Sequence, residues 1–197
     1  APMARHDNTL IPGRGMRVVL EVFLMTLSAP ASLRYVVRRM DITTRGIDPD
    51  GGVLELIAEA RDDGVAFERE QCFIHSTSWR HEPEGTIVLT YLAYSDYLSF
   101  PDETGAIIQP ADVRLATSAD PCRPGPREIR EEQVAAHAIR HLSFLVKNGR
   151  SAVHDILGPD TQRFLMAIND LPAGKFGVNI PATGGAAATT ALSFRPV

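Results

Sequence analysis

The chain has 197 residues, of which 44% are hydrophobic, and this suits a single globular domain over 1–197 with an ordinary buried core. Its formal net charge is -4 with acidic and basic residues interspersed, so it lacks the basic field that nucleic acid requires in a partner. The two cysteines, Cys72 and Cys122, lie in no CxxC pair, which argues against a zinc ribbon and a disulfide scaffold and favours a reducing, cytoplasmic environment.

The first predicted element is a strand over 17–27, whose β-branched valines suit a buried position. The basic residues before this run and the small residues after it resemble parts of a signal peptide. However, Glu21 falls in the middle of the run, which is also far shorter than the roughly 20 residues of a membrane span. We therefore expect a central strand and no contact with a membrane.

The segments that follow differ in how clearly they can be assigned. Residues 29–41 fit a short helix or a second strand, and the pattern leaves both open. Residues 46–52 are rich in glycine, proline and aspartate and are predicted to form a loop. A helix is predicted over 53–63, because apolar residues recur at helical spacing and Gly64 follows as a stop. The apolar positions are Val53, Leu56, Ile57 and Ala60.

Two runs of strand-forming residues within 71–95 flank the sequence Pro-Glu-Gly and predict a β-hairpin. Apolar residues occur on both of its faces, so we expect it to be buried between layers. With these three residues as the loop, the predicted pairs are Glu82 with Thr86, Trp79 with Leu89, Thr77 with Tyr91 and His75 with Ala93.

One face of this hairpin is a candidate ligand site. In the predicted register it carries His75, Thr77, Trp79 and Tyr91. The indole of Trp79, the single tryptophan of the sequence, could stack on a planar group while the imidazole binds a polar one. The alternative is a structural hairpin whose face packs in the core.

Residues 98–126 form a proline-rich segment that is long for a loop in a compact domain. Such segments often act as lids over binding sites, and the alternative is an exposed excursion. A helix is predicted over 127–147, with acidic residues in its first turns and Lys147 near its end, as the helix dipole favours. If a ligand site exists, we expect it between the Trp79 face of the hairpin and residues 98–126.

The C-terminal part is predicted to be helical and then irregular. A short helix over 151–157 ends at Gly158-Pro159, and Asp160 or Thr161 caps another helix that follows. The tail over 171–197 has few residues that could pack, so we expect it to be loosely held.

The chain contains no dinucleotide-binding, Walker, zincin or nucleophile-elbow motif. Residues 127–133, REIREEQ, reproduce the R-E-U-x-E-E-x core of the Nudix box, although Val134 stands where that motif has glycine. The earlier helix, in ELIAEARDDGVAF, looks like the end of a Nudix box and lies between a strand and a hairpin. Over residues 15–147 the chain therefore resembles a Nudix-like domain with a degenerate box.

The order of the predicted strands and helices indicates an α/β (α+β) fold with a mixed sheet flanked by helices, and the resemblance implies a Nudix-like sandwich. It also implies magnesium as the cofactor of pyrophosphate hydrolysis. Glu55, Glu59 and Asp62 lie on one helical face and could share one magnesium ion. The alternative is an ordinary solvated face opposite the apolar stripe.

His137 and His141 form an i, i+4 pair that could bind a transition metal. They share a helical face with apolar residues, so we expect them to face the domain, and the sequence offers no recognisable third ligand. Partly buried histidines that make hydrogen bonds are the interpretation that we favour.

Two classes of function stay open. The first, which we favour, is a non-catalytic Nudix-like module that binds a small nucleotide-like ligand and could form a homodimer. The second is a magnesium-dependent hydrolase of a nucleoside diphosphate derivative that uses the 53–63 helix. Neither class involves nucleic acid or a membrane, and the sequence identifies no catalytic residue.

Overall fold

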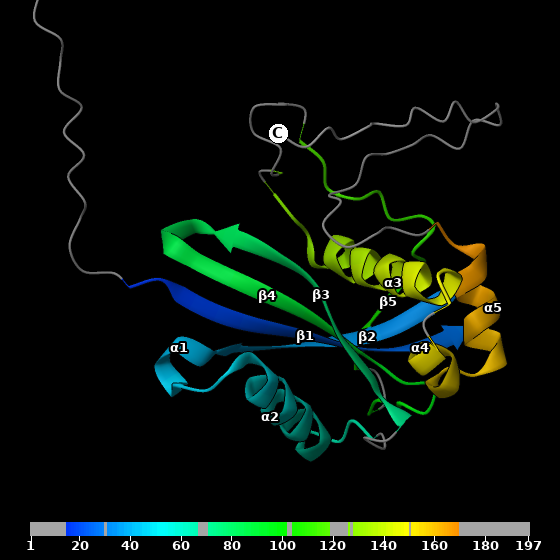
Figure 1. Cartoon of the computed structure of the whole chain (residues 1–197), viewed down its shortest axis with the longest axis horizontal. Coiled ribbons are helices and arrows are strands. Elements are labelled where there is room, and N and C mark those ends of the chain that lie inside the picture. The colour runs from blue at the N-terminus through cyan, green and yellow to red at the C-terminus, as the bar shows by residue number, and fades with distance from the viewer. Residues whose placement is uncertain are drawn as a thin grey trace, which may run out of the picture.

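The computed structural model describes residues 15–29, 31–66, 71–101, 104–118, 126, 128–149 and 151–169. The predicted tail over 171–197 and Cys122 lie outside the described residues. Within them, five strands form one mixed sheet in the order β3-β4-β1-β2-β5, with helices against both faces (Figure 1). This confirms the predicted α+β class, a mixed sheet flanked by helices.

β1 (Arg17–Ala29) is the central strand, as the sequence predicts. It pairs in antiparallel fashion with β2 (Ser32–Asp41) and in parallel with β4 (Thr86–Tyr94). The ambiguous run over 29–41 is therefore mainly a strand. Side chains of β1 alternate between two cores, one on each face of the sheet, and this explains why the strand is apolar on both sides.

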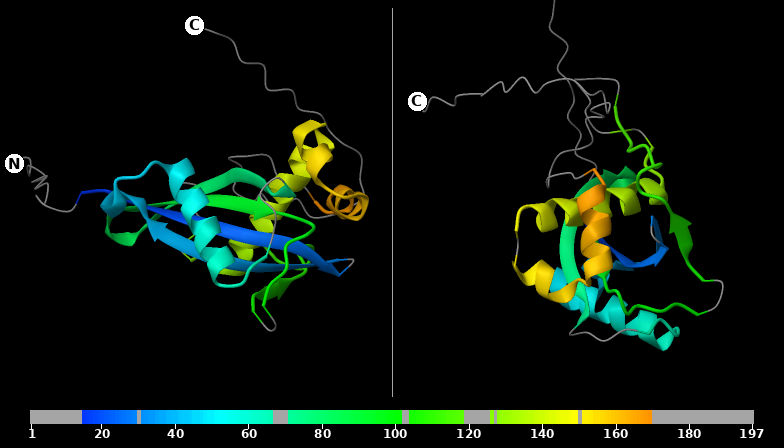
Figure 2. Two further views of the ribbon diagram at one scale, coloured as in Figure 1. Left: turned by 90° about the horizontal axis from the view of Figure 1, so that it is seen from below. Right: turned by 90° about the vertical axis from the view of Figure 1, so that its right-hand side faces the viewer.

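One face of the sheet packs against α1 (Ile42–Arg45) and α2 (Pro49–Asp62), which Figure 2 shows together on that side. α2 begins at Pro49, so the prediction of a loop over 46–52 is wrong in its second half. Asp48 caps this helix, because its carboxylate accepts a hydrogen bond from the N–H of Gly51 at 2.9 Å. The core on this face includes Leu20, Val22, Leu24, Val53, Leu56, Ile57 and Ala60.

The opposite face packs against α3 (Glu131–Lys147), with α4 (Ser151–Ile156) and α5 (Pro159–Ala167) beside it (Figure 2). The N-cap of α5 is Gly158, so the prediction of a cap at Asp160 or Thr161 is wrong. Instead, the carboxylate of Asp96, just after β4, accepts a hydrogen bond from the Gly158 N–H at 2.5 Å. Asp96, which is remote in the sequence, thus satisfies a backbone N–H at the start of α5 that a local cap would otherwise satisfy.

β3 (Phe73–Glu82) and β4 form the predicted hairpin around a 3₁₀ turn at Pro83–Gly85. The predicted pairs of Glu82 with Thr86 and of Trp79 with Leu89 are confirmed. However, β3 is an edge strand, and the Trp79 side chain is 61% exposed. The prediction that the whole hairpin is buried between layers is therefore wrong for its outer strand.

Farther from the turn, the register differs from the prediction because a β-bulge makes Thr77 an extra residue in β3. The observed pairs are Ser76 with Tyr91 and His75 with Leu92, so the predicted pairs of Thr77 with Tyr91 and of His75 with Ala93 are wrong. The buried hydroxyl of Thr77 donates a hydrogen bond to the Thr90 carbonyl at 3.3 Å. Relative to a regular ladder, the bulge moves His75 to the other face of the sheet.

β5 (Ala106–Ile108) pairs with β2 at the other edge of the sheet. It lies within residues 98–126, for which the sequence predicted a loop alone, so the described part of this segment includes a short strand. Ile108 joins the core on the α3 face. None of the helices in the described ranges is long and apolar enough to cross a membrane.

Candidate ligand-binding site

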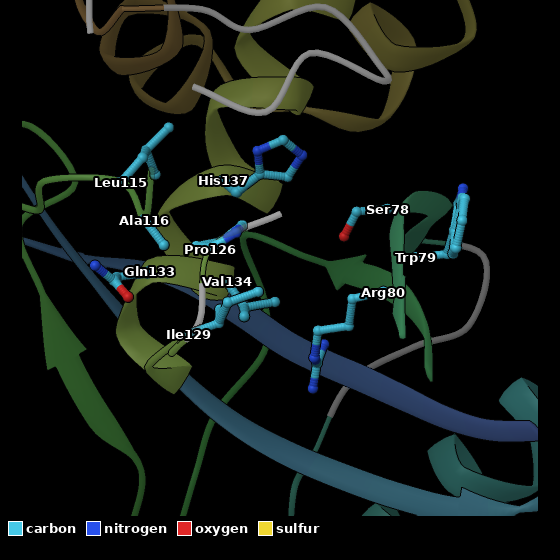
Figure 3. Close-up of a pocket in the computed structure, with 10 residues that line it drawn as sticks. All are labelled: Ser78, Trp79, Arg80, Leu115, Ala116, Pro126, Ile129, Gln133, Val134 and His137. Carbon is cyan, nitrogen blue, oxygen red and sulfur yellow. The ribbon is translucent and has the colours of Figure 1, made fainter. Parts of the chain in front are cut away.

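A narrow slot opens between the edge strand β3 and the first turns of α3 (Figure 3). Its cavity volume is small, about 40 Å³, enough for a few waters. Its shape therefore suits a flat or slender group rather than a whole large ligand. The lining residues are Ser78, Trp79, Arg80, Leu115, Ala116, Pro126, Ile129, Gln133, Val134 and His137.

The outer wall of the slot is apolar and belongs to the segment that precedes α3. Leu115 is buried against the α3 core, and the helix holds the backbone that precedes it. Nη2 of Arg140 donates to the carbonyls of Pro110 and Val113 at 2.7 and 3.0 Å, and Nε2 of Gln133 donates to the Arg114 carbonyl at 3.0 Å. These bonds satisfy backbone carbonyls that would otherwise face an apolar wall.

The inner side of the slot is polar and consists of Ser78, Arg80 and His137. Burial lowers the pKa of His137, a hydrogen bond with the Thr77 backbone opposes this effect, and the charge of Arg140 adds to it. The imidazole is therefore neutral near neutral pH. It offers a ligand a neutral polar edge rather than a charge.

Arg80 links the slot to an ionic network that crosses four strands. Its guanidinium donates two hydrogen bonds to the buried carboxylate of Glu21, at 2.7 and 2.8 Å, and a third to Glu82 at 3.0 Å. Arg39 bonds Glu82 at 2.9 Å and lies 3.2 Å from Glu21. Burial opposes the charge of Arg80, but the bonds and charges of Glu21 and Glu82 outweigh it and raise the pKa of the guanidinium. The two arginines and two glutamates neutralise one another.

The structure does not bring the four predicted ligand-binding residues into one pocket. Trp79 borders the slot, but Figure 3 shows its ring on the other side of the β3 ribbon from Ser78 and Arg80. Thr77 is buried in the bulge, and His75 turns towards α3. Tyr91 lies against the core on the α2 face, where burial and the charge of Asp50 raise the pKa of its hydroxyl.

His75 and His141 meet between β3 and α3. Their Nε2 atoms are 3.0 Å apart, and their ring planes differ by 5°. The ring centroids are 5.0 Å apart, much farther than the Nε2 atoms, so the rings meet edge to edge through one hydrogen bond. Together with the contact of His137 to the Thr77 backbone, this confirms that both histidines of α3 face the domain and make hydrogen bonds.

The predicted magnesium site lies on the solvent side of α2. Arg45 Nη1 lies 3.1 Å from a carboxylate oxygen of Glu55 and 3.7 Å from one of Glu59, while Asp62 is exposed. In the part of the chain that the structure describes, no group of three or more His, Cys, Asp or Glu side chains is arranged to hold a metal ion. Magnesium binding by these carboxylates stays a prediction.

No family model, no curated protein and no solved structure matches this chain. The Nudix resemblance therefore stays a prediction.

Proposed function

We propose that the protein is a binding module rather than an enzyme, and that it takes a small ligand without a large net charge. A planar or branched apolar group of this ligand enters the slot between β3 and α3. The observation that carries the proposal is the composition of the slot, in which Leu115, Ile129 and Val134 oppose the polar Ser78 and Arg80. Ligand pockets commonly combine an apolar lining with a few convergent polar groups.

The charges around the slot narrow the class of ligand. Arg80 and Arg39 are paired with Glu21 and Glu82, as described above. Farther along the same sheet, Nε of Arg17 lies 2.9 Å from the Asp41 carboxylate. A polyphosphate would have to displace these carboxylates, whereas a neutral or zwitterionic ligand would not. Of the nucleotide-like ligands that the sequence suggested, we therefore favour a free base or a nucleoside. Aromatic amino acids, which are zwitterionic and carry a planar group, are further candidates.

We extend the proposal to a cytoplasmic protein, because two cysteines outside any CxxC pair favour a reducing environment. Of the two, Cys72 is buried, and burial raises the pKa of its thiol to about 12. It is therefore a neutral, unreactive thiol near neutral pH and behaves as a small core residue.

The test is a screen of nucleobases, nucleosides, nucleotides and aromatic amino acids by thermal shift, followed by calorimetry on each hit. Val134→Phe should fill the slot and weaken binding by at least about tenfold, which is about 1.4 kcal/mol. Leu54→Phe, on the exposed side of α2, is the matched control and should bind as the unchanged protein does. A blank screen, or hits that Val134→Phe still binds equally well while folded, would contradict the proposal.

A further inference from the structure

We propose that the histidine contact between α3 and β3 forms an acid-sensitive clasp that sets the width of the slot. The clasp consists of the His75–His141 pair, and His137 lies one helical turn away on the same helix. Acidification opens it and moves the first turns of α3 away from β3. The proposal rests on the proposed function in assigning the slot a ligand, but the clasp itself can be measured without one.

The His75–His141 contact limits how many protons the pair can hold. Two Nε2 atoms 3.0 Å apart need one proton between them, so one ring donates and the other accepts. The neutral pair and the pair with one positive charge both satisfy this condition. A second positive charge would place two N–H groups against each other, and the hydrogen bond would be lost.

The surroundings of the pair make the doubly protonated state costly. The side chain of His141 is 2% exposed. Phe73 lies against His75 and Phe144 against His141, with ring centroids 5.7 and 6.4 Å apart. An apolar environment disfavours a charged imidazole, and like charges at close range add to the cost. The uptake of a second proton by the pair therefore has to separate the rings or expose them to water.

Several other charged and titratable groups on the elements packed here have partners of their own. Arg80 and Glu82 on β3 bond to each other, and Glu21 on β1 bonds to Arg80. Arg140 on α3 bonds to backbone carbonyls and adds positive charge on the side of the helix histidines. His137 on α3 contacts the Thr77 backbone, and Tyr94 on β4 bonds to Asp96 and Thr161.

The burial of the neighbouring His137 responds to acid in the same direction. Burial lowers the pKa of His137, so the unfolded chain binds a proton at a higher pH than the folded chain does. The stability contributed by neutral His137 is fully present above the unfolded pKa of about 6.5. It is lost as the pH falls below that value towards the folded pKa. Acid therefore disfavours the partly buried position of His137, although its hydrogen bond with the Thr77 backbone favours the charged form.

The clasp and the slot share the same two elements. His137 lines the slot and lies one helical turn from His141, while Val134 and Gln133 form the wall in the preceding turn. On β3, the bulge at Thr77 lies between His75 and the slot residue Ser78. Loosening this contact therefore changes the distance between the walls of the slot.

The test is nitrogen-15 NMR of the histidine rings of the full chain, titrated from about pH 8 to about pH 4, which extends below the usual imidazole range because the second proton of the pair is costly. Near neutral pH, His75 and His141 should show opposite tautomers, one protonated at Nε2 and the other at Nδ1. On acidification, the amide signals of β3 and of the first turns of α3 should change together with ring protonation. Rings that each take up a proton without any change in these amides would overturn the proposal.

Variants supply a second measurement. His75→Gln with His141→Gln replaces the imidazoles by amides that can bond each other but do not titrate, so most of the amide change should be lost. His81→Gln, an exposed histidine of the same strand, is the control and should behave as the unchanged protein. Equal pH profiles for all three proteins would also overturn the clasp. Because these measurements use no ligand, this outcome would not contradict the proposal that the slot binds a ligand. A blank ligand screen, in turn, would not contradict the clasp.

Discussion

At the scale of single residues, Glu21 is a carboxylate in the middle of the most buried strand, and its partners explain why it is tolerated there. Arg80 donates two hydrogen bonds to it, and Arg39 lies within 3.2 Å. In the sequence, the same residue served only to exclude a signal peptide, because both partners are remote along the chain. Removing one member of such a buried group is costly, whereas removing a matched pair is not.

Glu21→Gln should lower the free energy of unfolding by about 3 kcal/mol, because it leaves the buried guanidinium of Arg80 with too little negative charge. The double variant Glu21→Leu with Arg80→Met should recover most of this loss. Urea denaturation measures both. Asp63→Asn, in the exposed pair with Arg38, is the control and should change stability by less than about 1 kcal/mol. A double variant no more stable than the single one would contradict the explanation.

Gly52 is required by packing rather than by loop flexibility. A Cβ atom at this position would lie 2.4 Å from Cδ1 of Leu20 and 2.9 Å from Cγ2 of Ile42, both in the core. Gly52→Ala should therefore destabilise the protein by about 1–3 kcal/mol, although alanine favours helices by about 1 kcal/mol over glycine.

The neighbouring glycine of α2 gives a matched control for this prediction. At Gly51 the nearest heavy atom to an added Cβ is a side-chain oxygen of Asp48 at 3.4 Å, an ordinary contact. Gly51→Ala should leave the thermal unfolding temperature unchanged or raise it. If both variants lowered it equally, helix geometry and not the contact with Leu20 would explain the effect.

At the scale of elements, periodicity predicted the sheet and the main helices, whereas boundaries and registers depend on contacts outside each segment. The central strand and α2 were predictable because their apolar residues repeat at the spacing of the element. The sequence predicted a loop where α2 starts, because Gly51 and Gly52 are typical of loops. In the structure, the Asp48 cap holds Gly51 and close packing against core side chains holds Gly52. The bulge at Thr77 leaves no mark in the strand pattern, and it decides which face His75 occupies.

The candidate site was only partly predictable for the same reason. The sequence placed a site between the hairpin and residues 98–126, and the slot does lie between residues of those two segments and α3. Of the four predicted side chains only Trp79 borders the slot, because the slot lies on the α3 side of the sheet, whereas the predicted face of the hairpin lies on the α2 side. The pairing of His75 with His141 joins residues that are 66 positions apart, and no local pattern encodes it.

α5 depends on a cap that a different element provides. Asp96, after β4, accepts hydrogen bonds from the Gly158 N–H, the Thr161 hydroxyl and the Tyr94 hydroxyl. Asp96→Ala should lower the free energy of unfolding by about 2 kcal/mol, as the loss of a cap does. Hydrogen exchange should speed up most at the amides of α5. Asp160→Ala, in an exposed pair with Arg163, should leave exchange unchanged, and an equal effect there would contradict a special role for Asp96.

At the scale of the whole molecule, the two faces of the sheet offer two separate candidate sites, and these correspond to the two classes of function. The slot lies on the α3 face, where β3 and the segment before α3 leave a narrow space. The carboxylates of α2 lie on the outer side of the helix that covers the other face. A ligand in the slot and a magnesium ion on α2 would therefore have no shared wall, and each can be tested without the other.

The last prediction concerns the magnesium hydrolase. In such a hydrolase, carboxylates bind the magnesium ion, and the ion binds the pyrophosphate. Glu55 and Glu59 both lie near the guanidinium of Arg45, which competes with magnesium for their charge. We therefore expect magnesium to leave the thermal unfolding temperature unchanged and nucleoside diphosphate sugars to remain intact. An ion present at about ten times its dissociation constant would instead stabilise the fold by about 1.4 kcal/mol.

Two variants decide which group controls magnesium binding. Arg45→Gln removes the competing cation, so any weak binding of magnesium by these carboxylates should become detectable by calorimetry in that variant first. Glu59→Gln without the Arg45 substitution should leave the response to magnesium unchanged, because we expect no magnesium ion at the carboxylate that it removes. Hydrolysis near the enzyme median of about 10 per second that Glu59→Gln abolishes would reverse the conclusion and make the α2 carboxylates the active site.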